Sequence, residues 1–408
     1  MSSTIPARVI WALGVTQVIG YGTLYYAFSV LAPAIGATFS WPPEWVFGAL
    51  TVALLAGGLL APVAGHLADR FGAARTMAIG SIAVAVLLAA AGLAGNGYLF
   101  AAALIGMEIA SALVLYATAF AALVQAGGRG AQRSITHLTL IAGFASTLFW
   151  PLTSALLSVM DWRAIYLIFA GLNLVVCFPL HYWLAKRPTA VATPSDPGSI
   201  KSAASENGTL HGRDRSIGFA LMLLGFAVEG FVLSAVLMQI IPILSSLELG
   251  TGALLVTTMF GPAQVLSRLV NMVFGSNLSQ TRLAIIAALL PPLATAVLVL
   301  TAPSLIGALA FALLFGLGSG LTSIVSGSLP LQLLGRERYG SRLGWLSSAR
   351  QVASAIAPFL LAVAMSGTGV SGALWIVVGL GAVSVTTFGV IALLSGAGNA
   401  RRTAAAAT

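Results

Sequence analysis

Long apolar runs recur along the whole chain and constrain its fold more than any other feature. Each run has about 18 residues or more, which is enough for a helix to cross the hydrocarbon core of a bilayer. No water is available there, so a spanning segment must satisfy its own backbone hydrogen bonds. The pattern predicts an all-α integral membrane protein with twelve transmembrane helices, at 9–33, 45–64, 76–95, 97–124, 134–158, 164–184, 216–241, 251–275, 283–301, 304–330, 343–366 and 371–395.

Charged residues are too scarce for a soluble protein of this size. Of the 408 residues, 59% are hydrophobic and 7% are charged, whereas soluble domains carry about 25% charged residues. The net charge of +9 could indicate nucleic-acid binding, but the basic residues stand singly or in pairs and form no dense stripe. We therefore expect a lipid bilayer around the chain and no nucleic-acid partner.

One long polar segment, residues 185–215, interrupts the apolar pattern. Its Pro, Ser, Gly and charged residues cannot bury enough apolar surface to fold, which predicts a flexible cytoplasmic linker. The linker separates an N-terminal six-helix bundle, 1–184, from a C-terminal six-helix bundle, 216–408. Pro151 and Pro358 follow Arg133 and Arg342 at similar distances, which indicates a pseudo-symmetric repeat.

The distribution of Lys and Arg predicts the orientation. If the N-terminus is cytoplasmic, nearly all basic residues outside the spans fall on the cytoplasmic side, and Arg163 is the exception in an outer loop. Positive residues accumulate on the inner side of membrane proteins. We expect a multi-pass monomer in the cell (inner or plasma) membrane with both termini cytoplasmic.

The loop after the second span carries a short motif of glycine, acidic and basic residues. Its glycines allow two helices to turn back tightly, and its aspartate can cap a helix N-terminus or pair with a cation. The motif residues are Gly65, Asp69, Arg70, Gly72 and Arg75.

This motif resembles the signature loop of the major facilitator superfamily, although Ala74 stands where the family usually has a second basic residue. The turn Asp161-Trp162-Arg163 also resembles one that is common in the family. The resemblance implies the major facilitator fold, a secondary transporter rather than an enzyme, and a gating role for the loop. No phosphate-binding loop or metal-ligand spacing is evident, so we expect no cofactor and no metal.

Four ionisable residues lie well inside the spans: Glu108, Glu229, Arg268 and Arg350. Each charge near the bilayer centre costs on the order of 3 kcal/mol, so each needs a partner or a water-filled cavity. Arg268 and Arg350 are both expected roughly 10 Å from the cytoplasmic edge, at 1.5 Å per residue. They could therefore contact one ligand together. The alternative is that the two arginines simply pair with the two glutamates.

The eighth span is similar to the corresponding helix of monocarboxylate and oxalate/formate carriers, in which an arginine binds the substrate carboxylate. Arg268 would take that role, and Arg350 is similar to a second cation of the oxalate/formate group. Gln264 stands where monocarboxylate carriers have a proton-coupling aspartate, so the resemblance implies a proton carrier elsewhere. Glu229, at the centre of its span, is the first choice, and Glu108 is the second.

Other polar residues share helix faces with these candidates. Gln264, Arg268 and Asn271 form one stripe on the eighth span, and Gln17, Tyr21 and Tyr25 recur at intervals of four on the first. The tyrosines could instead be packing residues. We interpret all of these as candidate substrate-binding residues.

The sequence therefore predicts a transporter of a small organic anion of the carboxylate type, working by alternating access and coupled to protons. The alternative within the same fold is an efflux pump for hydrophobic or cationic toxic compounds, or a metabolite exporter. The fifth span, 134–158, lacks the proline-glycine pattern of antiporters, which argues mildly against drug antiport.

Overall fold

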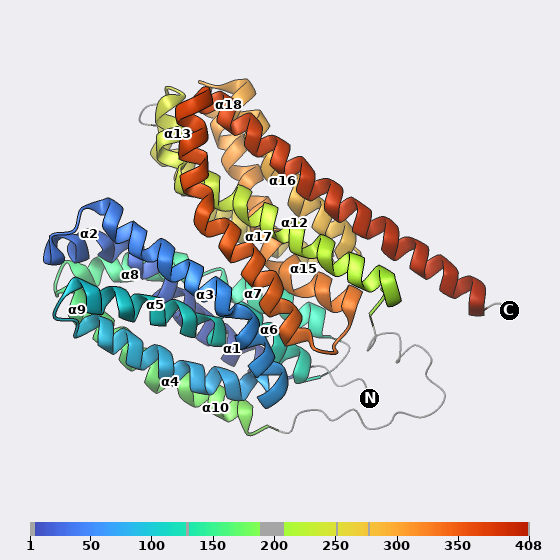
Figure 1. Ribbon diagram of the computed structural model, residues 1–408, viewed down its shortest axis with the longest axis horizontal. Helices are drawn as coiled ribbons and strands as arrows, with labels where there is room; N and C mark the ends of the chain where they lie inside the picture. The colour runs from blue at the N-terminus through green and yellow to red at the C-terminus, as the bar shows by residue number, and fades with distance from the viewer. Residues whose placement is uncertain (1–4, 128–129, 188–207, 250–251, 276–277, 407–408) are drawn as a thin grey trace. The chain divides into compact units, whose positions relative to one another are not determined.

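The computed structural model describes residues 5–127, 130–187, 208–249, 252–275 and 278–406. Within these ranges every regular element is helical and none is a strand (Figure 1). Of the predicted linker 185–215, residues 188–207 lie outside the described ranges. The chain forms two compact units, Met1–Ser195 with Arg338–Ser348 as unit 1, and Asp196–Glu337 with Ala349–Thr408 as unit 2.

Unit 1 contains the helices of the first six predicted spans. In this unit α4 packs against α5, α9 and α10, α3 packs against α5, and α1 packs against α7. The elements are α1 (Ala7–Tyr21), the π-helical η1 (Gly22–Tyr26), α2 (Ala27–Phe39), α3 (Pro43–Phe71), α4 (Ala73–Gly92), α5 (Gly97–Val114), α6 (Tyr116–Gln125), α7 (Ala131–Ala142), α8 (Ala145–Leu157), α9 (Trp162–Leu172), the π-helical η2 (Asn173–Cys177) and α10 (Phe178–Ala185).

Most helices of the second half belong to unit 2, where α17 packs against both α15 and α16. The elements are α12 (Gly212–Met238), α13 (Ile240–Ser246), α14 (Gly252–Thr258), α15 (Phe260–Phe274), α16 (Gln280–Thr301), α17 (Leu305–Leu334) and α18 (Tyr339–Ala406). Residues 208–210 run along the end of α17, because Thr209 N–H donates to the Gln332 carbonyl (3.1 Å) and Leu210 N–H to the Leu333 carbonyl (3.0 Å).

The described helices account for the twelve predicted spans. Among the described residues, ten helical stretches are long and apolar enough to cross a membrane, and one of them, Tyr339–Gly396, covers two of the predicted spans. Gly369, with φ 72°, interrupts it between the two. The eighth span consists of α14 and α15, which are separated at Met259. Pro262 explains this break, because its ring clashes with the carbonyl four residues earlier and it has no N–H to donate. The prediction of an all-α membrane protein is confirmed.

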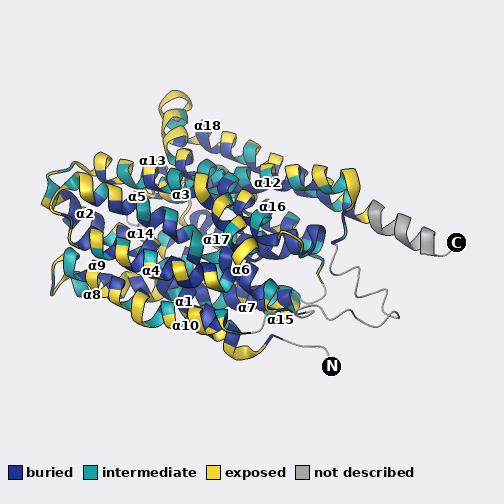
Figure 2. Cartoon of the chain, turned by 60° about the horizontal axis from the view of Figure 1, so that its bottom comes forward, coloured by how far each residue is buried: buried dark blue, intermediate teal, exposed yellow. Residues whose placement is uncertain are grey.

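Each unit has an apolar interior and an apolar exterior. Aromatic side chains form much of the interior of unit 1, where Phe100, Trp162 and Tyr166 are each 1% exposed. Along the same helices, buried and exposed residues alternate (Figure 2). Many exposed positions are large hydrophobes, including Leu300 at 72% and Val175 at 71%. Such a surface is stable in lipid rather than in water.

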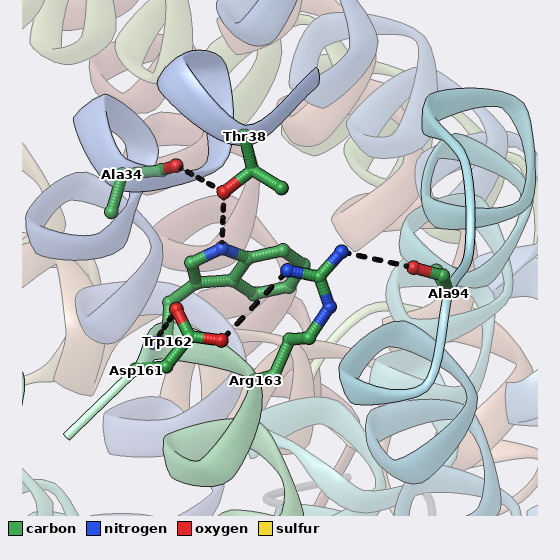
Figure 3. Close-up of polar contacts among 6 residues, drawn as sticks. All are labelled: Ala34, Thr38, Ala94, Asp161, Trp162 and Arg163. Carbon is green, nitrogen blue, oxygen red and sulfur yellow. Dashed lines mark hydrogen bonds and ion pairs between the residues drawn. The ribbon is translucent and has the colours of Figure 1, made fainter.

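The turn Asp161-Trp162-Arg163 ties the start of α9 to two other parts of unit 1 (Figure 3). The Asp161 carboxylate accepts from Trp162 N–H (2.8 Å), and the Trp162 indole N–H donates to the Thr38 hydroxyl (2.8 Å). Arg163 lies over the Trp162 ring at 4.5 Å and donates to the Ala94 carbonyl (3.3 Å). The turn therefore connects α9, α2 and the loop after α4.

Helices α3 and α5 approach each other closely at Gly57. A Cβ atom at Gly57 would lie 2.6 Å from the Glu108 carbonyl oxygen, whereas a Cβ at Gly48, on the same helix, would meet nothing within 4 Å. Alanine is favoured over glycine in a helix by about 1 kcal/mol, so both positions gain the same local preference. Only Gly57 meets backbone that cannot easily move.

We therefore expect Gly57→Ala to destabilise the protein by about 1–3 kcal/mol, and Gly48→Ala to leave it unchanged or slightly more stable. Thermal unfolding of the two variants in the same detergent measures the difference. Equal unfolding temperatures would contradict the close approach of α3 and α5.

Candidate functional site

Small residues on α17 allow neighbouring helices to pack closely at the candidate site in unit 2. A Cβ at Gly316 would lie 2.6 Å from the Ala263 Cβ, and a Cβ at Gly320 would lie 2.5 Å from the Gln264 carbonyl. The absence of side chains at these two glycines lets α15 pack directly on α17, as small residues do in membrane helix pairs. Ser319, between these glycines, and Thr322 and Ser323, which follow them, reach polar side chains of other helices.

The first of these contacts involves Glu229, on α12. Its side chain is buried, with 3% of the residue exposed, and its carboxyl group makes a short hydrogen bond with the Thr322 hydroxyl. The same hydroxyl is 3.0 Å from the Gly318 carbonyl. Because a hydroxyl has one proton to donate, Thr322 can serve only one of these two acceptors at a time.

Arg268, on α15, meets the next residue of α17. It is 6% exposed, and its Nε donates to the Ser323 hydroxyl (3.1 Å). One turn earlier on α15, the Gln264 amide donates to the Ser319 hydroxyl (3.3 Å). The predicted pair Gln264 and Arg268 therefore lies along one face of α17.

Arg350, on α18, lies beside Glu229. A Cβ at Gly230, the residue after Glu229, would be 2.6 Å from the Arg350 Cγ. Two hydrogen bonds hold α12 to α18 further along, from the Ser234 hydroxyl to the Ser354 carbonyl (2.7 Å) and from the Gln239 amide to the Pro358 carbonyl (3.1 Å).

These contacts define a polar cluster in unit 2, which consists of Glu229, Arg268, Thr322, Ser323 and Arg350. Across the described ranges, no ion pair within 4.0 Å joins Glu229 to either arginine. The structure thus brings both predicted arginines and the first-choice glutamate together through hydroxyl groups and neighbouring backbone. Among the described residues, no close carboxylate–guanidinium ion pair joins the members of the cluster.

Asn271 lies one turn beyond Arg268, toward the end of α15. Its Oδ1 atom is buried and has no hydrogen-bond partner among the described residues. The Asn271 side chain lies over Gly275, where a Cβ atom would collide with it. None of its described contacts joins it to the polar cluster, so its role in substrate binding stays a prediction.

The predicted stripe on the first span has varied surroundings. Gln17 is fully buried in unit 1, and its amide donates to the Val114 carbonyl (2.7 Å) at the end of α5. The ring of Tyr21 lies 4.6 Å from that of Tyr116, and Tyr25, 46% exposed, lies 5.2 Å from Tyr26. The π-helical segment η1 includes Tyr25, and its wider turn alters the spacing that the sequence predicted.

Glu108 lies in α5, inside unit 1, with 5% of the residue exposed. The Ser111 hydroxyl donates to its backbone carbonyl (2.7 Å) and also interacts with its carboxyl group. The described surroundings of Glu108 belong to unit 1.

The signature loop places its aspartate against the start of α18. The Asp69 carboxylate accepts from Gly340 N–H (2.8 Å), from Ser341 N–H (2.7 Å) and from the Ser341 hydroxyl (2.6 Å). A carboxylate at a helix N-terminus is favourable because free N–H groups and the helix dipole both attract it. Gly72, with φ 92°, forms the turn between α3 and α4. The gating role of Asp69, together with that of Gly65, Arg70 and Arg75, stays a prediction.

Sequence reasoning missed the three α17 residues that hold the site, Ser319, Thr322 and Ser323. A signal was present, because the stretch 316–328 is rich in Gly, Ser and Thr at helical spacing. Small and hydroxyl residues concentrated on one transmembrane helix favour close packing and hydrogen bonds between helices.

A sequence model of the Major Facilitator Superfamily matches residues 13–358 of this chain. The match includes the signature loop and all five residues of the polar cluster. It extends over both units.

Solved structures with the same fold are transporters. The human organic anion transporter MFSD10 (TETRAN) superposes with a TM-score of 0.73 at 16% identity, over 94% of this chain and 99% of that one. The E. coli fucose:proton symporter FucP gives a TM-score of 0.68 at 13% identity, over 93% and 98%. The proton:xylose symporter XylE gives 0.68 at 13% identity, over 93% and 95%. At these identities the likeness concerns the fold alone.

The chain also has sequence similarity to an antibiotic resistance protein. The lincomycin resistance protein of Streptomyces lincolnensis is 28% identical over 179 residues, which is 43% of this chain. The matched region spans 37% of the length of that relative.

Proposed function

This chain belongs to the Major Facilitator Superfamily, and we propose that it carries a small organic anion of the carboxylate type across the cell membrane, coupled to protons. The polar cluster supports this proposal, because Arg268 is buried in a membrane span and no carboxylate within 4.0 Å neutralises it among the described residues. Its Nε is satisfied by the neutral Ser323 hydroxyl, which positions the guanidinium without cancelling its charge. A bound carboxylate would supply the opposite charge.

Coupling to protons is supported by the arrangement around Glu229. When the carboxyl group is ionised, Thr322 can donate to it. When it is protonated, its own O–H can donate to Thr322, whose proton then goes to the Gly318 carbonyl 3.0 Å away. The Glu229 carboxyl group is therefore hydrogen-bonded in both protonation states. A proton can bind and leave without depriving a buried polar group of its hydrogen-bond partner.

Two adjacent residues of α17 bind the two proposed functional side chains. Thr322 is hydrogen-bonded to Glu229, the proposed proton carrier, and Ser323 to Arg268, the proposed anion-binding residue. In our proposal, anion binding at Arg268 and protonation of Glu229 keep the charge within the cluster balanced during alternating access. In our proposal both termini are cytoplasmic, as the distribution of Lys and Arg predicts, which gives the orientation of the carrier in the membrane. The substrate is a small molecule, and we expect the carrier to be a monomer.

The role of Arg268 can be tested by uptake of radiolabelled mono- and dicarboxylates into proteoliposomes. For a carboxylate that the wild type carries, we expect Arg268→Gln to raise KM by about 30-fold or more, because removing one partner of a buried charge pair costs about 2–5 kcal/mol. Arg282→Gln serves as the control, since Arg282 is exposed at the start of α16. Unchanged uptake in Arg268→Gln would overturn the assignment.

The role of Glu229 can be tested by comparing gradient-driven accumulation with exchange. We expect Glu229→Gln, which keeps the shape but cannot titrate, to lose pH-driven accumulation while substrate counterflow persists. Thr322→Val should weaken accumulation as well, because it removes the hydroxyl that partners the Glu229 carboxyl group in both protonation states. Glu248→Gln is the control, since Glu248 is exposed. If Glu229→Gln accumulated substrate against its gradient, Glu229 would not be the coupling residue.

A second candidate function is efflux of hydrophobic or cationic toxic compounds, and the similarity to a lincomycin resistance protein favours it. Under this alternative Glu229 or Glu108 would contact the cation. Growth of a drug-sensitive host on lincomycin and on lipophilic cations separates the two. We expect expression of the wild type to leave the inhibitory concentrations unchanged. A fourfold or greater increase that Glu229→Gln abolishes would favour efflux instead.

A further inference from the structure

A groove in unit 1 runs along the exposed surface of the first span. It lies between α1 and α10, which pack against each other (Figure 2). Its volume is about 510 Å³, and the side chains around it are those of Arg8, Trp11, Ala12, Val15, Leu180 and Trp183. Apart from Arg8 the lining is apolar or aromatic. Trp11 is 61% exposed, so the groove is open to its surroundings.

Positive charges gather at one end of this groove. Arg8 lies in the first turn of α1, and Lys186 and Arg187 follow the end of α10. Arg187 lies over the Trp183 ring at 4.1 Å, and Lys186 lies over the Tyr182 ring at 4.5 Å. Arg8 and Trp183 both line the groove, and Arg187 lies over Trp183, so the two guanidinium groups are at the same end of the groove. Desolvation and the nearby positive charge of Arg8 lower the pKa of Arg187. Among the described residues, no acidic side chain forms an ion pair with any of the three.

The charged end and the apolar remainder lie at different depths. Val15 is seven residues beyond Arg8 on α1, and Leu180 is seven residues before Arg187 on α10, a rise of roughly 10 Å along each helix. A ligand that fits this groove thus carries an anionic group at the helix ends and an apolar part at hydrocarbon depth. Aromatic rings and basic side chains at such a level are typical of the lipid headgroup region.

We propose that this groove binds one anionic phospholipid, with its phosphate between Arg8 and Arg187 and an acyl chain against Val15 and Leu180. The headgroup phosphate relieves the repulsion between the two arginines, and the ring of Trp183 keeps Arg187 in place. A second copy of this chain is a poorer occupant. A symmetric dimer through this face would bring the arginines of both copies together.

The site lies on the side of the membrane where the first span begins and the sixth ends, which is the predicted cytoplasmic side. Anionic lipids of the cytoplasmic leaflet attract basic residues near the membrane surface by about 1 kcal/mol each. Two convergent arginines therefore favour an anionic over a zwitterionic lipid by about tenfold or more.

The test uses the full chain in detergent, titrated with phosphatidylglycerol or with phosphatidylcholine of the same acyl chains, and native mass spectrometry to count bound lipid. We expect one phosphatidylglycerol to bind about tenfold more tightly than phosphatidylcholine. The double variant R8Q/R187Q should lose this preference. The matched control R213Q/R282Q removes two other exposed arginines and should retain it.

A second variant separates a specific groove from general attraction to charge. Val15→Trp keeps every basic residue but fills the apolar part, so we expect it to lose the tightly bound lipid as well. Inorganic phosphate, added in place of lipid, should neither stabilise the wild type against thermal unfolding nor displace phosphatidylglycerol. Equal binding of the two lipids by the wild type would overturn the proposal. So would an equal loss in the control variant, unchanged binding in Val15→Trp, displacement by phosphate, or a dimer seen in place of the lipid complex.

Discussion

Inside the bilayer no polar group can form a hydrogen bond to water, and every other feature of this protein depends on that constraint. The helices satisfy the backbone, and most hydroxyl groups return to their own helix, as Thr295 does by donating to the Pro291 carbonyl (2.9 Å). The hydroxyls of Thr322 and Ser323 contact carbonyls of their own helix and, in addition, ionisable side chains of α12 and α15. Helix α17 thereby makes two charged residues tolerable at a depth where charge is costly.

Glycines determine which hydroxyl meets which charge. Gly316 and Gly320 let α15 approach α17, and Gly230 lets the stem of Arg350 lie against α12 next to Glu229. Larger side chains at these positions would separate the helices and leave the buried polar groups without partners, at a cost of about 1–3 kcal/mol each. In unit 2, therefore, the same close contacts that stabilise the helices also assemble the polar cluster.

The charges of the cluster are near one another but are not closed into tight ion pairs in the described structure. This arrangement is less stable than a neutral core, and it leaves both an acid and a cation able to respond to a proton or an anion. A carrier needs such responsiveness, because its substrate and its coupling ion must each change the energy of the protein when they bind. In the proposed mechanism, the proton-binding and anion-binding side chains are held by two adjacent residues of one helix, Thr322 and Ser323.

The sequence by itself determined the membrane-spanning helices, since the length of an apolar run and the thickness of hydrocarbon can be compared without knowing any contact. It also identified Glu229, Arg268 and Arg350, because a charge inside an apolar run is conspicuous. Only the tertiary structure decided the hydrogen-bond partners of these side chains. Glu229 is bonded to Thr322 and Arg268 to Ser323, and the Gln17 amide donates to the Val114 carbonyl. These partners lie far apart in the sequence. Their meeting depends on the rotation and close approach of whole helices, which glycines set through contacts that no local pattern records.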